Sequence, residues 1–100
     1  MTDIGVYTKK ETLEEKKKFT ADEGCWAHWS LHKEPGEWPE RIFFAADGKW
    51  QGFFTIDDIN DDFGNFDHYM IFLEEWHELE EKPERKPFQG FTYDVPEAVQ

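Results

Sequence analysis

The chain has 100 residues, of which 38% are hydrophobic and 18% aromatic, and its formal net charge is −12 at pH 7. So many aromatic residues exclude a disordered chain, and the length fits one domain, residues 1–100, with a single core. The strong negative charge argues against binding of long nucleic acids, because such binding depends mostly on lysine and arginine.

Cysteine usage and hydropathy bound the cellular setting. A single cysteine, Cys25, leaves no internal disulfide. The N-terminus lacks a basic stretch followed by an apolar one, and the longest apolar runs, such as residues 42–46, are too short to cross a bilayer. We therefore expect a cytoplasmic protein with no membrane contact.

The N-terminal third predicts a helix and then a strand. Thr8 and Glu11 have the capping-box spacing, which favours a short helix over residues 9–19 that covers something larger. Residues 25–31 alternate in the manner of a half-buried strand, and the Pro- and Gly-containing residues 33–40 read as a loop.

The strongest local signal is a hairpin. Asp47-Gly48 separates the β-type runs 41–46 and 49–56, and both central positions of a type I′ turn need a positive φ. We then expect an acidic loop over residues 57–67, followed by a strand at residues 66–73.

Two more elements complete the prediction. Trp76 and Leu79 lie three residues apart, which favours a short helical turn within residues 74–81, and the alternation of residues 88–95 favours a last strand. The fold class is therefore α+β and mostly β, a small barrel of five to six strands with one N-terminal helix. Closure is favoured because it removes exposed strand edges.

Three segments carry a family resemblance: PERIFFAADGKWQGFFTI at residues 39–56, the strand at residues 69–73 with Trp76, and PFQGFTY at residues 87–93. Together they resemble the small PUA-like barrels, including the ASCH type, over residues 25–95. The resemblance implies recognition of RNA or modified bases in a cleft beside the first helix, and for a few members hydrolysis of nucleosides or RNA. The ASCH pattern of Gly, Lys, Glu and Arg is absent around residues 9–18.

Candidate chemistry is sparse. For nucleophilic catalysis, Cys25 is the obvious thiol and His28 follows it by three positions. A lone cysteine at a strand start, however, is usually a small core residue. Residues 58–64 contain carboxylates and a glycine, yet not at the EF-hand spacing. We expect no metal, no cofactor and no catalytic residue, with a nucleoside or RNA hydrolase of the ASCH type as the enzymatic alternative.

The acidic tract gives the first functional hypothesis. Ten carboxylates and no lysine or arginine lie between residues 57 and 81. Such a surface attracts a basic protein partner, and in the extreme case imitates a phosphate backbone, as small acidic inhibitors from phages and mobile elements do. The candidate partner-binding residues are Asp57, Asp58, Asp61, Asp62, Asp67, Glu74, Glu75 and Glu78.

The tryptophans give the second hypothesis. Five in 100 residues exceed what so small a core needs, so some are expected to stack on a small nucleotide-like ligand. The candidates are Trp26, Trp29, Trp38 and Trp50. We therefore expect a non-catalytic binding module whose ligand is either a basic protein surface or a small nucleotide-like molecule.

Overall fold

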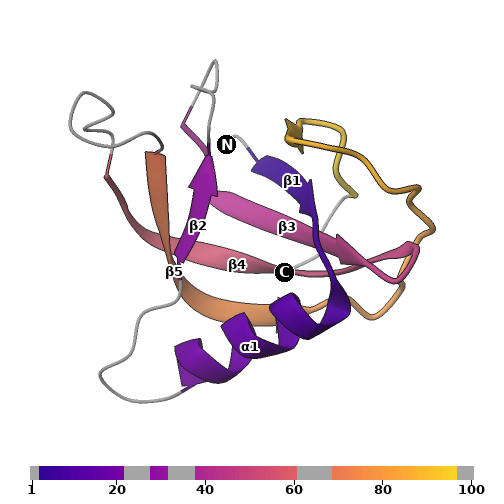
Figure 1. Cartoon of the computed structure of the whole chain (residues 1–100), viewed down its shortest axis with the longest axis horizontal. Coiled ribbons are helices and arrows are strands. Elements are labelled where there is room, and N and C mark those ends of the chain that lie inside the picture. The colour runs from indigo at the N-terminus through magenta and orange to yellow at the C-terminus, as the bar shows by residue number, and fades with distance from the viewer. Residues whose placement is uncertain (1–2, 22–27, 32–37, 61–68, 97–100) are drawn as a thin grey trace.

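The computed structural model describes residues 3–21, 28–31, 38–60 and 69–96. Its elements are β1 (Asp3–Tyr7), α1 (Lys10–Ala21), β2 (His28–Leu31), β3 (Arg41–Ala46), β4 (Lys49–Asn60), β5 (Tyr69–Glu78) and β6 (Phe91–Thr92). The strands form one six-stranded sheet in the order β2-β5-β4-β3-β1-β6. The sheet curls into a half-barrel with α1 beside it (Figure 1), which confirms the mostly-β α+β class.

The predicted hairpin is confirmed. β3 and β4 are antiparallel, and Asp47 and Gly48 both have positive φ angles, 55° and 80°. The helix and β2 also lie where the sequence places them, although α1 begins at Lys10 and ends at Ala21.

An N-terminal strand was not predicted. β1 lies parallel to β3, with Asp3 beside Arg41 and Tyr7 beside Ala45. Only two of its residues are large aliphatic side chains, Ile4 and Val6, and both are fully buried. β1 therefore depends on its long-range partner, and five residues with a central glycine carry no strand signal of their own.

The acidic tract is the main correction to the predicted elements. β4 continues to Asn60, through the start of the expected loop, and β5 continues to Glu78, where a helical turn was predicted. The two strands pair from Gly52↔Glu78 to Asn60↔Met70, so the ladder gives the backbone of both segments its hydrogen-bond partners. The expected strand at residues 88–95 shortens to β6.

Side chains of β3 alternate between two hydrophobic clusters. Ile42, Phe44 and Ala46 join Leu13 of α1 in the larger cluster, on what we call the helix-side face of the sheet. Phe43 and Ala45 belong to a second cluster on the opposite face, with Trp50 and Phe53. The sheet therefore buries apolar side chains on both faces, which is why the chain needs so many aromatic residues.

Candidate functional site

The three described candidate tryptophans lie on two sides of the sheet, Trp29 and Trp38 against one cluster and Trp50 in the other. Trp50 is only 4% exposed and packs in the second cluster, so its ring is not open to a ligand in this structure, and its role as a ligand contact stays a prediction. Trp29 and Trp38 are half-buried against the helix-side cluster, where their rings meet Phe44 and Tyr69 edge-on at 5.1 and 5.2 Å. Trp26 lies outside the described residues.

Four of the predicted carboxylates lie at nearby positions of two neighbouring strands. Asp57 and Asp58 on β4 and Glu74 and Glu75 on β5 all lie within two residues of the Ile56–Leu73 pair, and all four are exposed. We call these four residues the carboxylate strip. Asp61, Asp62 and Asp67 lie outside the described residues.

A double irregularity in the ladder shapes the strip. The β4–β5 register shifts between Phe54 and Ile56 and again between Ile56 and Asp58. At the first shift the Glu75 amide donates to the Thr55 hydroxyl at 3.1 Å, so a side chain replaces the regular backbone partner. Such bulges locally bend and twist a strand, and here they occur where the carboxylates gather.

The strip carries no compensating cation within the described part of the chain. Asp57, Asp58 and Glu74 form no ion pair there, and the nearest cationic candidate for Glu75 is the His77 imidazole, 3.8 Å away. Other acidic residues are neutralised: Asp3 holds Arg41 through two hydrogen bonds of 2.9 and 2.7 Å, and Asp94 meets Arg85 at 3.1 Å. Among the described residues, the strip is therefore distinguished by having no lysine or arginine partner.

Glu78 behaves differently from the strip. It accepts hydrogen bonds from Lys82 at 3.1 Å and from the Trp76 indole at 3.3 Å, and Lys17 lies 4.0 Å away. Partial burial opposes ionisation, but these hydrogen bonds and cations outweigh it and lower the pKa of Glu78 below its ordinary value. Glu78 thus serves contacts within the fold.

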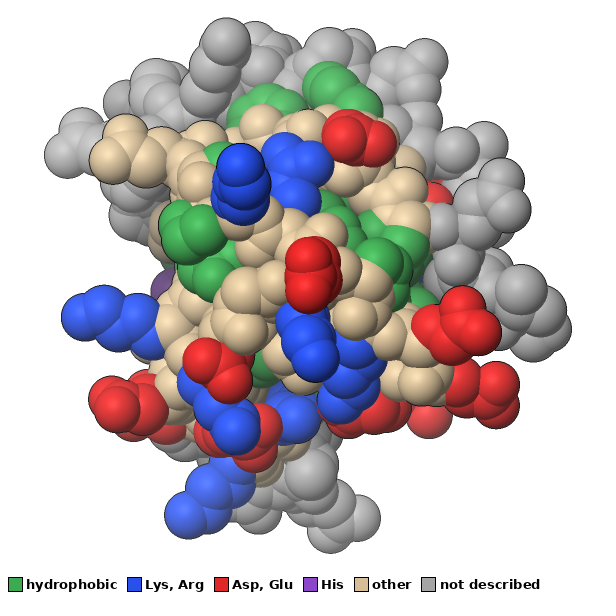
Figure 2. Space-filling view, turned by 90° about the vertical axis from the view of Figure 1, so that its right-hand side faces the viewer, with side chains coloured by type: hydrophobic (Ala, Val, Ile, Leu, Met, Phe, Trp, Pro, Cys, Tyr) green, Lys and Arg blue, Asp and Glu red, His purple; other side chains and the backbone are tan. Residues whose placement is uncertain are grey.

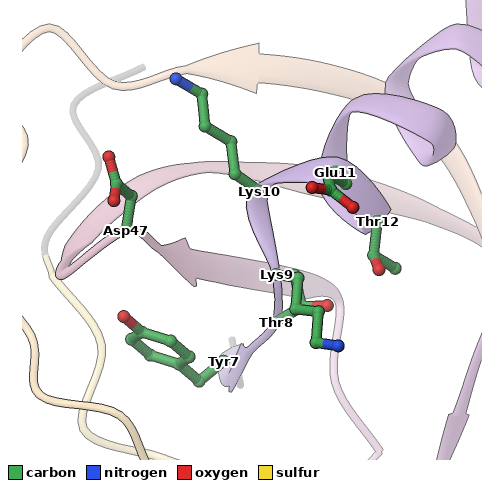
Figure 3. Close-up of a pocket in the computed structure, with 7 residues that line it drawn as sticks. All are labelled: Tyr7, Thr8, Lys9, Lys10, Glu11, Thr12 and Asp47. Carbon is green, nitrogen blue, oxygen red and sulfur yellow. The ribbon is translucent and has the colours of Figure 1, made fainter.

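A pocket of about 690 Å³ opens at the start of α1 (Figure 3). The lining residues are Tyr7, Thr8, Lys9, Lys10, Glu11, Thr12 and Asp47. Its floor is set by the sheet: the Gly48 amide donates to the Tyr7 hydroxyl at 2.7 Å and the Thr8 amide donates to Ala45 at 2.9 Å. The backbone amides in the first turn of α1 carry partial positive charge, which adds to the charge of Lys9 and Lys10 at this pocket.

The residues that line this pocket were not among the predicted site residues, although the family resemblance implies a cleft beside the first helix. The two halves of the pocket, the Asp47-Gly48 turn and the start of α1, are about forty positions apart and meet only because Tyr7 pairs with Ala45. Two sequence signals mark the segments that line the pocket: the capping-box spacing at Thr8 and the Asp47-Gly48 turn. Figure 2, which views the side of the molecule where this turn lies, shows Lys and Arg intermixed with Asp and Glu, in contrast to the strip.

Searches for a metal site, a membrane span and related proteins do not identify a further functional site in the described residues. Within the ranges described, no three His, Cys, Asp or Glu side chains are grouped to hold a metal ion, and no helix has the length and apolar character to cross a bilayer. Comparison with protein-family models, with curated proteins and with solved structures finds no significant match to this chain.

Proposed function

We propose that this chain is a non-catalytic binding module that docks a basic protein surface through the carboxylate strip. The observation that carries the proposal is the gathering of Asp57, Asp58, Glu74 and Glu75 on adjacent strands with no lysine or arginine paired to them in the described ranges. Like charges with no lysine or arginine partner repel one another, so the fold gains nothing from their proximity. A basic partner relieves that repulsion.

Electrostatic docking sets a definite expectation for kinetics and salt. A field of one sign speeds association with a cationic surface, and exposed charges are screened within a Debye length of about 10 Å at 0.1 M salt. Affinity for a basic partner should therefore fall steeply as salt rises, mainly through slower association.

The test uses a lysine-rich peptide as probe and two variants of equal net charge. Asp57→Asn/Glu74→Gln neutralises half of the strip, whereas Glu81→Gln/Glu84→Gln removes two exposed carboxylates outside it. We expect the first variant to lose about fivefold in affinity at low salt and the second less than about twofold, as close charge pairs couple more strongly than distant ones. Equal losses would mean that the peptide responds to net charge alone.

The pocket beside α1 supports a second candidate function, binding of a small nucleotide-like anion. Two exposed lysines, Lys9 and Lys10, flank the first turn of the helix, where backbone amides and the helix dipole favour a phosphate. Tyr7 supplies an aromatic ring at the same opening. Glu11 and Asp47 offset part of the positive charge of the lysines, so this ligand would carry a single phosphate.

Adenosine monophosphate is the probe for this second candidate. Titration should shift the backbone amide resonances of residues 10–12, and Lys9→Gln/Lys10→Gln should weaken binding about tenfold. The control Lys18→Gln/Lys86→Gln removes the same charge from exposed positions away from the pocket. Shifts spread over the whole molecule, or equal weakening by both variants, would contradict a pocket site.

A further inference from the structure

One short loop near the C-terminus is held to the sheet by a single side chain. Residues 86–90, which we call the Phe88 loop, connect Arg85 to β6. Only Phe88 is half-buried in this loop, and the other four residues are exposed. No hydrogen bond joins the loop backbone to another residue of the described ranges, whereas the Arg85 amide just before it donates to Gly48 at 2.8 Å. A segment with so few buried contacts and hydrogen bonds belongs to the parts of a protein that open most readily.

The Phe88 ring contacts three side chains that can each bind a planar ring. Its centre lies 5.9 Å from that of Tyr7 on β1 and 6.1 Å from that of Trp50 on β4, within the usual range of aromatic pairs. The Arg85 guanidinium lies 4.6 Å from the centre of the Phe88 ring. Arg85 is positioned from outside the loop, by its backbone and by an ion pair with Asp94 at 3.1 Å. Two aromatic rings and one guanidinium therefore surround the place that Phe88 occupies.

This set of side chains suits a nucleobase. Proteins bind unpaired bases by stacking them on aromatic rings and on arginine guanidinium planes. Tyr7 also lines the α1 pocket, so the place of the Phe88 ring adjoins the pocket that contains Lys9 and Lys10 (Figure 3). One nucleotide could thus present its phosphate to the lysines and its base to Tyr7.

We propose that Phe88 is an internal competitor for a nucleobase: the Phe88 loop opens, and the base of a small nucleotide takes the place of the Phe88 ring. This inference rests on the second candidate function and makes it specific, because it names the position of the base and the segment that blocks it. Trp50, which is only 4% exposed with Phe88 in place, becomes a stacking surface when the loop opens. An internal competitor lowers the apparent affinity in proportion to the fraction of molecules whose site is open.

Two probes and two variants test the proposal. The probes are adenosine monophosphate and ribose 5-phosphate, which keeps the phosphate and lacks the base. Phe88→Ala removes the competing ring, whereas Leu79→Ala removes another half-buried side chain of the second cluster and leaves Phe88 in place. If the wild-type loop is open about a tenth of the time, Phe88→Ala should bind adenosine monophosphate about tenfold more tightly, and Leu79→Ala should stay within about twofold of the wild type. Ribose 5-phosphate should gain nothing from either variant.

A second variant keeps every packed side chain. Pro87 is exposed and restricts the backbone of the Phe88 loop, so Pro87→Gly should favour the open loop and strengthen binding of adenosine monophosphate by about twofold. Circular dichroism shows whether each variant folds. If Phe88→Ala does not fold, Pro87→Gly decides the test.

The outcomes separate this inference from the function on which it rests. Unchanged or weaker binding of adenosine monophosphate by folded Phe88→Ala overturns the inference, while the pocket stands if Lys9→Gln/Lys10→Gln still weakens binding to the wild type. Equal gains for adenosine monophosphate and ribose 5-phosphate also overturn it, because Phe88 would then block the phosphate and not the base. Binding of adenosine monophosphate to neither the wild type nor Phe88→Ala removes the second candidate function and this inference together.

Discussion

The close contact between Gly5 and Trp50 shows how much of this fold depends on one missing side chain. A Cβ atom built on Gly5 would clash with Cη2 of the Trp50 ring and would lie 2.8 Å from both Cζ3 of that ring and Val95 Cγ1. The indole ring covers β1 because there is no side chain between them. Trp50 is thus fixed in the second cluster by the backbone of a distant strand.

Gly5→Ala should therefore destabilise the protein by about 3 kcal/mol, the upper range for overpacking a tight interior. Gly48→Ala is the comparison. Nothing lies within 4 Å of a Cβ built on Gly48, but its φ of 80° is unfavourable for any side chain, so this variant should lose about 1 kcal/mol of stability. Urea unfolding measures both. A Gly5→Ala variant no less stable than Gly48→Ala would show that Trp50 moves aside easily.

The Asp3–Arg41 pair fastens β1 to β3. Both side chains are only 15% exposed, and the Arg41 guanidinium also lies 5.1 Å from the centre of the Phe53 ring. The hydrogen bonds that Arg41 donates to the Asp3 carboxylate raise the pKa of Arg41 above its ordinary value, although burial alone would lower it. The guanidinium therefore stays charged and needs its carboxylate.

Asp3→Asn should cost about 2 kcal/mol, because it leaves a largely buried guanidinium without its counter-charge. Asp94→Asn breaks the exposed pair with Arg85, where Asp94 is 86% exposed, and should change the free energy of unfolding by less than about 0.5 kcal/mol. Chemical denaturation of both variants gives the comparison. Equal losses of stability in the two variants would mean that the Arg41 guanidinium becomes hydrated when Asp3 is neutralised.

Glu78 gives a pH-dependent prediction. Its pKa is lowered in the folded protein, so its contribution to stability is present above the ordinary value of 4.5 and is lost as the pH falls through the folded pKa. Glu78→Gln should reduce stability at pH 7 by about 0.5 kcal/mol, since the group is half exposed. Thermal unfolding of both proteins should converge below pH 4.5; a constant difference would point to packing instead of charge.

At the scale of elements, the described side chains of α1 contact the sheet through one apolar residue and two lysines. Leu13 is its only fully buried residue within the described side chains, and the ammonium groups of Lys16 and Lys17 lie 5.4 and 5.1 Å from the ring centres of Trp29 and Trp76. Burial also lowers the pKa of Lys16, although Glu15 opposes this. The helix thus combines one apolar anchor with two lysine stems over tryptophans.

Leu13→Ala should destabilise the protein by about 3 kcal/mol through the lost burial and the cavity that remains. Glu15→Ala on the exposed side of the same helix should change stability by less than about 0.5 kcal/mol. Denaturation followed by far-ultraviolet circular dichroism measures both. A small effect of Leu13→Ala would show that the lysine–tryptophan contacts suffice to hold α1.

The β4–β5 ladder explains where sequence reasoning failed at this scale. The spacing of Trp76 and Leu79 fits a helical turn, and a run of glutamates favours helix, so residues 74–81 carry a local signal that the structure overrules. The ladder from Gly52 to Asn60 supplies backbone partners that no local pattern reveals. By contrast, the Asp47-Gly48 turn needs no distant partner, and its prediction is confirmed.

Over the whole molecule, the net charge of −12 costs stability through self-repulsion. The carboxylate strip concentrates that cost in one place, which is expected of a surface retained for binding. Function and stability should therefore respond in opposite directions to its neutralisation.

Asp57→Asn/Glu74→Gln should raise the free energy of unfolding by about 0.5 kcal/mol, as neighbouring like charges are removed. Added sodium chloride should stabilise the wild type more than this variant, because screening relieves the same repulsion. Urea unfolding at low and high salt tests both expectations. If the variant is less stable than the wild type at every salt concentration, these carboxylates support the fold.

Composition and short-range pattern determined by themselves that the chain is acidic, folds around aromatic side chains, and contains a helix and a hairpin. These properties follow from residue type and neighbouring positions. Only the tertiary structure decided that the Trp50 side chain is buried, that Asp57 and Glu74 lie on adjacent paired strands, and that the α1 pocket forms beside Asp47. Each of these depends on strand register, which brings distant residues together and is fixed by the packing of both sheet faces at once.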